Sequence, residues 1–281
     1  RSALLFERKM NTNDDLFNLD EETIVLTGVS GQLGSVYAKA LLEHGASKVI
    51  GLDIRDSEIS KKLSIDYKSR FLFIETDITD KDSIRRTLQK IKSLQLAPTV
   101  LINNAGLDSN PDSSSDDACR FEDYSEETWD KVLDVNLKGV FLCCQVFGGQ
   151  MAKNKKGRII NISSIYGLVS PDQNMYEYRR KKGEDFYKPV AYSASKSGLI
   201  NLTKYLAVYW AKDNVTVNTL TIAGVFNNQD QDFLDQYNQR IPIGRMAKED
   251  DYNGAIIFLS SNASNYMTGS NLIIDGGWTA I

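Results

Sequence analysis

The sequence predicts an α/β fold in which one parallel, doubly wound sheet is covered by helices on both faces. Short segments rich in β-branched residues alternate along the chain with longer segments of helical periodicity. The helical segments are about ten residues or longer, as the crossovers between parallel strands require. The chain has 281 residues, of which 42% are hydrophobic and 25% charged, so one domain can bury a large core. We therefore expect a single domain over residues 1–281, with residues 1–20 as an N-terminal extension.

Seven segments are predicted strands because each is a short apolar or β-branched run. Pro98 precedes the fourth segment and Gly157 the fifth, and both are residues that commonly separate elements. The predicted strands are Thr23–Thr27, Lys48–Leu52, Phe71–Thr76, Thr99–Asn103, Arg158–Ser163, Val215–Leu220 and Asn271–Asp275.

Six segments are predicted helices. The first is amphipathic and stops at Gly45, and we expect the histidine before it, His44, to end the helix without any chemical role. The predicted helices are Leu33–His44, Ser83–Leu94, Ser125–Lys153, Val190–Asp213, Asp230–Gln239 and Glu249–Ser261.

Composition excludes several classes of protein. The net charge of −4 leaves no basic stripe for nucleic acid, and no apolar run approaches the roughly 18–20 residues that span a bilayer. Cys119, Cys143 and Cys144 are badly spaced for a disulfide framework or a metal site, which favours a reducing cytoplasm. Residues 1–10 lack a signal-peptide cleavage pattern, and Met10 is a candidate natural start.

A glycine-rich segment between the first strand and the first helix predicts a dinucleotide site. Gly28, Gly31 and Gly34 permit a tight turn and let the backbone approach a pyrophosphate at the helix N-terminus. By itself the segment is also compatible with a plain strand-to-helix turn. Asp53 ends the second strand 19 residues after Gly34, where a carboxylate binds ribose hydroxyls and repels a 2′-phosphate. This favours NAD, although nearby Arg55 is compatible with NADP.

Tyr192 and Lys196 are spaced for acid–base chemistry. Oxidation of an alcohol needs a base for the hydroxyl proton, and tyrosine, with a pKa near 10, is a poor base at neutral pH. A lysine at i+4 lies on the same helix face, and its charge favours the phenolate. Such a pair also arises by chance in a chain with 13 tyrosines, so the spacing alone leaves both interpretations open.

Together these segments resemble the short-chain dehydrogenase/reductase superfamily over about Glu22 to Trp278. The matching pieces, in order, are the glycine loop, Asn103-Asn104-Ala105-Gly106, Asn136 in Asn-Leu-Lys-Gly, Ser164 in Ile-Ser-Ser-Ile-Tyr-Gly, Tyr192-Ser-Ala-Ser-Lys196 and Asp275-Gly-Gly-Trp278.

The resemblance implies a Rossmann-type sheet of seven strands in the order 3-2-1-4-5-6-7. It implies a catalytic tetrad in which Tyr192 is the acid or base and Lys196 binds the nicotinamide ribose. Ser164 would hold the substrate oxygen and Asn136 a water in a proton relay; Ser163 is the competing serine, but the spacing to Gly167 favours Ser164. The candidate cofactor-binding residues are Gly28, Ser30, Gln32, Leu33, Gly34, Asp53, Arg55, Asp77, Ile78, Asn104, Ala105, Gly106, Tyr192, Lys196, Ala223, Gly224 and Val225.

Three features depart from the family pattern. The glycine spacing is three and three, with Gln32 at the usual middle glycine, which is more usual in the sugar-nucleotide epimerase branch; too little chain follows the last strand for that branch's substrate domain. Ala223-Gly224 replaces the usual Pro-Gly after the sixth strand. Ser164 and Tyr192 lie 28 positions apart, against about 13 in the family, so Ser170–Pro189 is an insertion beside the active site.

The composition of the insertion bears on the class of substrate. One or two of its cations suit a phosphate or carboxylate clamp, although a solvated surface excursion or a subunit contact also explains them. The candidate substrate-binding residues are Tyr166, Tyr176, Arg179 and Arg180.

The insertion and the Ser-Ser-Ile-Tyr-Gly motif resemble a narrower group of bacterial oxidoreductases of flagellin modification and nonulosonic acid biosynthesis. This implies a hydride transfer between nicotinamide and a secondary alcohol or ketone of a sugar or sugar phosphate. The alternatives are a generic carbonyl or 3-oxoacyl reductase and a non-catalytic nucleotide-binding subunit. The segment from Gly244 to Trp278 resembles the oligomer-forming region of the superfamily and implies a homotetramer or homodimer.

Overall fold

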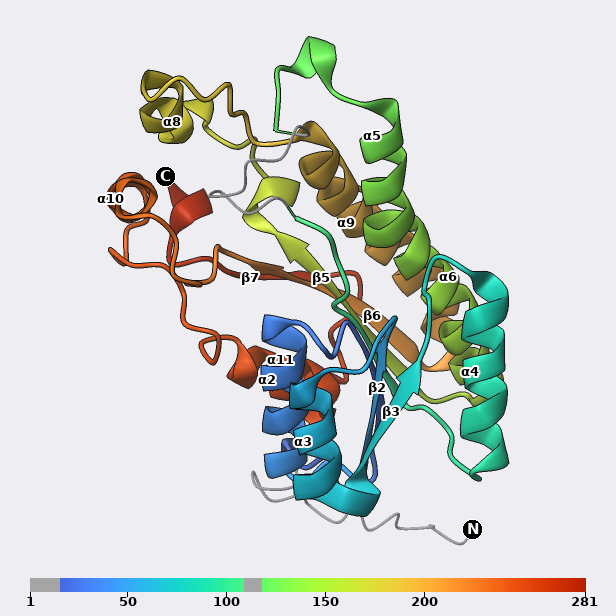
Figure 1. The fold of residues 1–281 in the computed structure, drawn as a ribbon. Helices are drawn as coiled ribbons and strands as arrows, with labels where there is room; N and C mark the ends of the chain where they lie inside the picture. Colours follow the sequence, from blue (N-terminus) through green and yellow to red (C-terminus); the bar gives the residue numbers. More distant parts are fainter. Residues whose placement is uncertain (1–15, 109–117) are drawn as a thin grey trace, which may run out of the picture.

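The computed structural model describes residues 16–108 and 118–281, which form a seven-stranded parallel sheet in the order β3-β2-β1-β4-β5-β6-β7 (Figure 1). Fold class, strand number and strand order are confirmed. Met10 and most of the Ser/Asp-rich segment 108–117 lie outside the described residues. The strands are β1 (Thr23–Thr27), β2 (Lys48–Asp53), β3 (Phe71–Glu75), β4 (Val100–Asn103), β5 (Gly157–Ser164), β6 (Val215–Ile222) and β7 (Asn271–Ile274).

Helices cover both faces of the sheet because the strands bury apolar side chains alternately on each side. In β1, Ile24 and Leu26 join one core cluster, and Val25 joins the other. The first cluster packs against α2 (Gln32–Glu43), α3 (Glu58–Tyr67) and α11 (Asn253–Ser260). The second packs against α4 (Lys81–Ser93), α9 (Val190–Trp210) and the helical stretch made of α5 (Glu126–Leu133), α6 (Val140–Cys143) and α7 (Gly149–Asn154).

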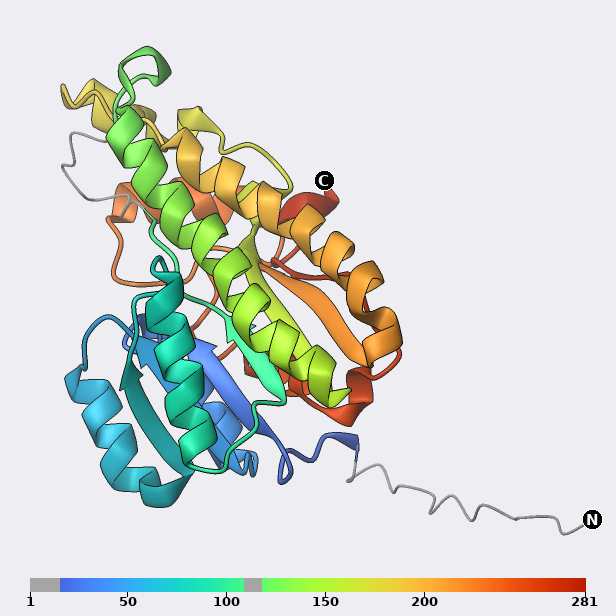
Figure 2. The same cartoon turned by 90° about the vertical axis from the view of Figure 1, so that its right-hand side faces the viewer.

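The stretch Glu126–Asn154 is one continuous helix in which α5, α6 and α7 are joined by π-helical turns at Asp134–Gly139 and Cys144–Gly148. It runs beside α9 across the sheet (Figure 2). Its length and apolar composition alone would allow it to cross a membrane. Phe147 and Met151 are fully buried against the sheet, which identifies it as a core helix of the domain.

Helix α3 was not predicted from the sequence. Ser57 begins it by accepting a hydrogen bond from the Ser60 backbone N–H, an N-cap that the sequence contains. The helix buries only Ser60 and Leu63 and leaves Ile59 and Ile65 exposed. Its apolar periodicity is therefore too weak to indicate a helix.

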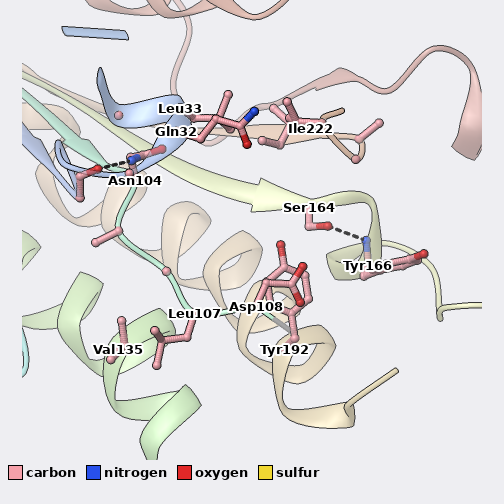
Figure 3. Close-up of a pocket in the computed structure, with 18 of the residues that line it drawn as sticks. Gln32, Leu33, Asn104, Leu107, Asp108, Val135, Ser164, Tyr166, Tyr192 and Ile222 are labelled. Atoms are coloured by element: carbon pink, nitrogen blue, oxygen red, sulfur yellow. Dashed lines mark hydrogen bonds between the residues drawn. The ribbon is translucent and has the colours of Figure 1, made fainter. Parts of the chain in front are cut away.

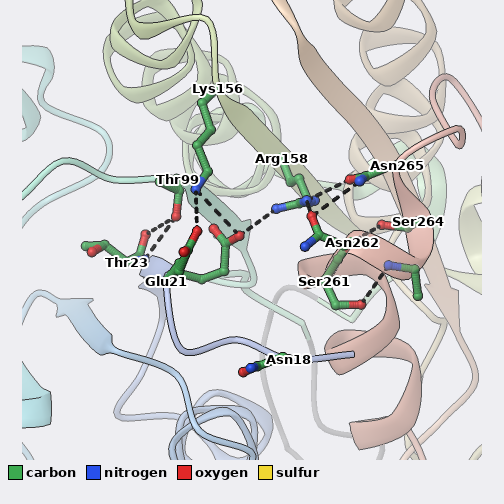
Figure 4. Close-up of polar contacts among 12 residues, drawn as sticks. Asn18, Glu21, Thr23, Thr99, Lys156, Arg158, Ser261, Asn262, Ser264 and Asn265 are labelled. Carbon is green, nitrogen blue, oxygen red and sulfur yellow. Dashed lines mark hydrogen bonds and ion pairs between the residues drawn. The ribbon is translucent and has the colours of Figure 1, made fainter. Parts of the chain in front are cut away.

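All carboxyl ends of the strands lie at one edge of the sheet, where α8 (Glu177–Lys181), α10 (Gln231–Arg240) and the C-terminal turn gather (Figure 1). The opposite edge is held by a buried polar network (Figure 4). Arg158 donates to Glu22 Oε1 at 2.9 Å and to the side-chain oxygens of Asn262 and Asn265 at 2.6 and 2.7 Å. This network ties the start of β5 to the segments that precede β1 and β7.

Candidate active site

A cavity of about 540 Å³ lies at the carboxyl edge of the sheet. It runs from the glycine loop, past the ends of β2 to β6, to the insertion and α10. The sequence-predicted residues that line it are Gly28, Gln32, Leu33, Gly34, Asp53, Asp77, Ile78, Asn104, Ala105, Gly106, Ser164, Tyr166, Tyr176, Tyr192, Ala223, Gly224 and Val225.

The glycine loop is packed too closely for side chains at two of its glycines. A Cβ on Gly28, whose φ is +71°, would lie 2.7 Å from the Ala105 Cα, and one on Gly34 would lie 2.0 Å from the Gly28 oxygen. Gly31 is the N-cap of α2, which has neither a side-chain cap nor an acidic residue in its first turn. The first N–H groups of α2 are therefore available to an anion. This cradle fits the pyrophosphate of a dinucleotide.

Asp53 is held rigidly at the end of β2. Its two carboxylate oxygens accept hydrogen bonds from the Ser30 N–H at 3.0 Å and the Ile54 N–H at 2.8 Å. Ser30 and Arg55 do not line the cavity themselves, and the Ser30 hydroxyl donates to the Arg55 carbonyl at 2.9 Å. Both predicted residues thus lie beside the Asp53 carboxylate without reaching the cavity.

The Asn103–Gly106 segment joins the glycine loop to the predicted tetrad. The Asn104 side chain donates to the Thr27 carbonyl at 3.1 Å, and the Thr27 hydroxyl accepts from the Asn104 N–H at 3.0 Å. A Cβ on Gly106 would lie 3.4 Å from both Asn136 Oδ1 and Lys196 Nζ. Glycine at this position therefore lets the β4 loop lie against two members of the predicted tetrad.

The loop after β6 is fixed by two tyrosines that the sequence analysis did not identify. The Gly224 N–H donates to the Tyr237 hydroxyl at 2.7 Å, and the Tyr252 hydroxyl donates to the Ala223 carbonyl at 3.1 Å. These bonds hold the loop in which Ala223 stands where the family has proline. No local pattern identifies these tyrosines, because α10 and the segment before α11 supply them from farther along the chain.

Tyr192 and Lys196 occupy adjacent turns of α9. Tyr192 lines the cavity, and Lys196 is buried behind it, with Nζ donating to the Ile162 carbonyl at 2.9 Å. Burial lowers the pKa of Lys196 to about 8, although the Asp108 carboxylate raises it. Burial and then Asp108 raise the pKa of Tyr192, whereas hydrogen bonding with Ser164 lowers it.

Ser164 and Ser163 differ in what they face. Ser164 lines the cavity, and its Oγ accepts a hydrogen bond from the Tyr166 N–H at 3.2 Å (Figure 3). Ser163 is buried and donates to the Lys196 carbonyl at 2.9 Å. A Cβ on Gly167 would lie 2.8 Å from that same carbonyl, which explains glycine at this spacing. Ser164 is thus the serine placed to bind a ligand, and Ser163 anchors α9.

Asn136 lies in the π-helical turn Asp134–Gly139 and is fully buried. Its side-chain amide donates to the Leu107 carbonyl at 2.9 Å and to Ser195 Oγ at 3.2 Å, and its Oδ1 accepts from the Leu107 N–H at 2.7 Å. The side chain therefore fixes the backbone directly before Asp108.

The insertion lines the cavity with Tyr176, which lies 5.9 Å from the Phe233 ring of α10 between ring centres. Arg179 is buried in an ion pair with Glu184 at 2.5 Å and lies over the Phe186 ring.

Arg180 donates to the Phe186 and Gln173 carbonyls at 3.0 and 2.8 Å. Neither arginine lines the cavity. The ion pair of Arg179 with Glu184 and the two hydrogen bonds of Arg180 hold the insertion in shape, and neither arginine is part of the substrate site proposed below.

Two charged residues not identified as candidates complete the site. Lys188 Nζ lies 2.5 Å from Asp108 Oδ1 and 5.2 Å from the centre of the Tyr192 ring. The Lys188 side chain is only 3% exposed. Their positions held a signal: Asp108 is two residues after the Asn-Asn-Ala-Gly motif, and Lys188 is four residues before Tyr192.

Comparisons with known proteins agree with this geometry. Residues 28–279 match the family described as enoyl-(acyl carrier protein) reductase. An NAD-dependent glycerol dehydrogenase from Listeria innocua is 31% identical, over 95% of this chain and 97% of its own. A short-chain dehydrogenase from Leptospira borgpetersenii, solved with bound NAD+, is 34% identical over 96% of both chains, with a TM-score of 0.82. The chain belongs to the short-chain dehydrogenase/reductase superfamily.

This short-chain dehydrogenase/reductase is an oxidoreductase that acts on CH–OH groups with NAD(P), as predicted. Two further relatives are named as dehydrogenases of sugar acids. A 2-dehydro-3-deoxy-D-gluconate 5-dehydrogenase from Dickeya dadantii is 30% identical over 94% of this chain and 98% of its own. A gluconate 5-dehydrogenase from Burkholderia cenocepacia, solved with NADP and tartrate, is 25% identical over 96% and 100% of the chains, with a TM-score of 0.83.

Proposed function

We propose that this enzyme moves a hydride between NAD and a secondary alcohol or ketone of a polyhydroxylated substrate, a sugar or sugar phosphate, with Tyr192 as acid or base. One observation carries the proposal: Tyr192 and Ser164 face the same cavity that the glycine loop lines, and Lys196 lies behind Tyr192. The tyrosine takes or returns the hydroxyl proton, and the serine holds the substrate oxygen. When bound, the nicotinamide supplies the carbon that accepts or donates the hydride.

The remaining roles follow from the contacts of each side chain. Lys196 Nζ would bind the nicotinamide ribose, a role supported by the absence of a side chain at the neighbouring Gly106. The Asn136 side chain is engaged with Leu107 and Ser195. A water in the proton relay would therefore bind the Asn136 backbone carbonyl.

NAD is the proposed cofactor because the fixed Asp53 carboxylate faces the ribose end and would repel a 2′-phosphate. The NAD-dependent Listeria relative and the NAD+-bound Leptospira structure support this preference. Structures of relatives with NADP argue for measuring both cofactors.

A polyhydroxylated substrate is supported by the names of the relatives, which include glycerol, gluconate and galactitol dehydrogenases. Resemblance to the nonulosonic acid group extends the proposal to bacterial surface-glycan biosynthesis in the cytoplasm. The match to the enoyl reductase family keeps a second candidate, an acyl or generic carbonyl reductase. The ion pair of Lys188 and Asp108 in the cavity favours a polar substrate over an acyl chain.

A homotetramer or homodimer is part of the proposal. Tyr205, Val208 and Tyr209 on the outer face of α9 are 65%, 82% and 65% exposed, an apolar surface that a second copy would cover. Light scattering tests this point, and the mass of a single chain would contradict it.

Turnover tests the function. We expect reduction of NAD, and weaker reduction of NADP, with at least one member of a panel of polyols, sugars, sugar phosphates and nucleotide sugars. Activity restricted to acyl thioesters or simple ketones would favour the reductase alternative. If none of these compounds is turned over, the result would favour the hypothesis of a non-catalytic nucleotide-binding subunit.

A further inference from the structure

The ion pair of Lys188 and Asp108 is held in place from both sides. The Gln173 side chain accepts from the Lys188 N–H at 2.9 Å and donates to the Lys188 carbonyl at 3.1 Å. The Asn136 side chain likewise makes two hydrogen bonds to the backbone of Leu107, the residue before Asp108: it accepts from the N–H and donates to the carbonyl. Two amide side chains from different elements thus fix the backbone of Lys188 and of the residue before Asp108, as a ligand-binding pair requires.

The two members differ in what they present to the cavity. The Asp108 side chain is 45% exposed, whereas that of Lys188 is 3% exposed. A ligand therefore meets the carboxylate, with the ammonium behind it. Among the described residues that line the cavity, the other charged side chains are the carboxylates of Asp53 and Asp77. The exposed Asp108 carboxylate repels an anion at this point and favours a hydroxyl group, which donates a hydrogen bond to it.

Asp108 also lies beside the reacting position. It and Tyr192 lie together below Ser164 and Tyr166 in the cavity (Figure 3). After burial, its charge is the strongest influence on the pKa of Tyr192. The Asp108 carboxylate thus acts on the position where a reacting oxygen would bind Tyr192 and Ser164.

We propose that Asp108, backed by Lys188, binds a second, uncharged hydroxyl of the substrate on the carbon next to the one that exchanges hydride. The inference rests on the proposed function and narrows its substrate class to vicinal diols at the reacting end. The insertion, through Lys188, thus determines specificity. A phosphate or carboxylate, where the substrate has one, lies farther from the reacting carbon.

Binding of matched ring alcohols tests the subsite. The enzyme is saturated with NADH, so that no alcohol is turned over, and titrated with cis-cyclohexane-1,2-diol, cyclohexanol and cis-2-hydroxycyclohexanecarboxylate. A hydrogen bond to a charged group predicts that the diol binds about 10- to 100-fold more tightly than cyclohexanol. The carboxylate should bind most weakly of the three. The proposal is overturned if the diol and cyclohexanol bind equally, or if neither binds detectably. It is also overturned if the carboxylate binds most tightly of the three.

Variants test whether the preference for the diol depends on the ion pair of Asp108 and Lys188. The double variant Asp108→Asn/Lys188→Met removes both charges with little change in volume, so no buried charge is left unpaired. It should bind diol and cyclohexanol within about threefold of each other while NADH binding is retained. The control Asp185→Asn removes a carboxylate of the insertion that does not line the cavity, and it should keep the wild-type preference. A double variant that retains the diol preference overturns the proposal.

Turnover with NAD separates this inference from the proposed function. Hydride transfer from alcohols without any diol preference would support the function and overturn the subsite. A diol preference in binding without hydride transfer from any alcohol would support the subsite and contradict the function.

Discussion

The ammonium nitrogen of Lys196 lies 5.7 Å from the centre of the Tyr192 ring, on the side of α9 that faces the sheet. Even with this cation near, burial and Asp108 raise the pKa of Tyr192 in the cofactor-free protein. The i+4 spacing alone therefore does not produce a base at neutral pH. A bound, positively charged nicotinamide adds the further attraction that favours the phenolate. We infer that acid–base competence depends on cofactor binding.

Lys196→Met should stabilise the cofactor-free protein at neutral pH. Burial lowers the pKa of Lys196 from 10.5 to about 8, so the buried ammonium is unfavourable below pH 8. A difference of this size corresponds to a gain on the order of 3 kcal/mol in the free energy of unfolding for the variant.

The gain should fall as pH rises from about 8 towards 10.5, where the unfolded wild type binds a proton that the folded protein does not. Thermal unfolding across pH 7–10 measures it, with Lys204→Met on the exposed face of α9 as control. A pH-independent difference would contradict the assigned pKa.

Asp108→Asn and Lys188→Met should move the pH profile of alcohol oxidation in opposite directions. The groups that influence Tyr192 are Asp108, Ser164, Tyr166 and Tyr237, together with the ammonium groups of Lys188 and Lys196 near its ring. Removing the carboxylate lowers the pKa of Tyr192 and shifts the acid limb of kcat/KM by about 1 unit to lower pH. Removing the Lys188 ammonium leaves the Asp108 carboxylate without its counter-charge. The acid limb of kcat/KM therefore shifts to higher pH. Shifts of the same sign would rule out this electrostatic account.

Asp53→Asn should weaken the preference for NAD over NADP. The substitution removes the negative charge that would repel a 2′-phosphate while it keeps an oxygen for the Ser30 N–H. We expect the ratio of kcat/KM for NAD to that for NADP to fall by about tenfold or more. Asp66→Asn, on the exposed side of α3, is the charge-matched control and should leave the ratio unchanged. An unchanged ratio in Asp53→Asn would show that another group selects the cofactor.

Arg158→Met should destabilise the domain without changing its cofactor preference. The guanidinium satisfies the buried Glu22 carboxylate, whose second oxygen has no partner in the described part of the chain. Loss of the cation leaves a buried charge and should cost about 3–5 kcal/mol in the free energy of unfolding.

The double variant Glu22→Gln/Arg158→Met should recover most of that loss in urea unfolding. Arg85→Met, which breaks an exposed ion pair with Asp82, should cost less than about 1 kcal/mol. Equal losses in Arg158→Met and Arg85→Met would contradict the role of the network.

The sheet and most of the cofactor site were predictable because their signals are local. Strand alternation, the glycine loop and the Tyr192–Lys196 spacing are each read within one short segment. Helix α3 was missed because it buries only two residues. The pair of Lys188 and Asp108 was missed because its members are 80 residues apart and meet only where the loop after β4 lies against the end of the insertion. Arg179 and Arg180 were more conspicuous in the sequence, but neither of them lines the cavity.

The rate of hydride transfer in Tyr192→Phe tests the central claim most directly. Rapid mixing of the NAD complex with a polyol substrate follows NADH formation in a single turnover. Tyr266→Phe, at a fully exposed tyrosine outside the proposed subunit contact on α9, is the control. Loss of the acid–base group predicts a rate lower by roughly 10²- to 10⁴-fold, with NADH binding unchanged and the control at the wild-type rate. A Tyr192→Phe variant that transfers hydride at the wild-type rate would contradict the assignment of Tyr192 as the acid or base.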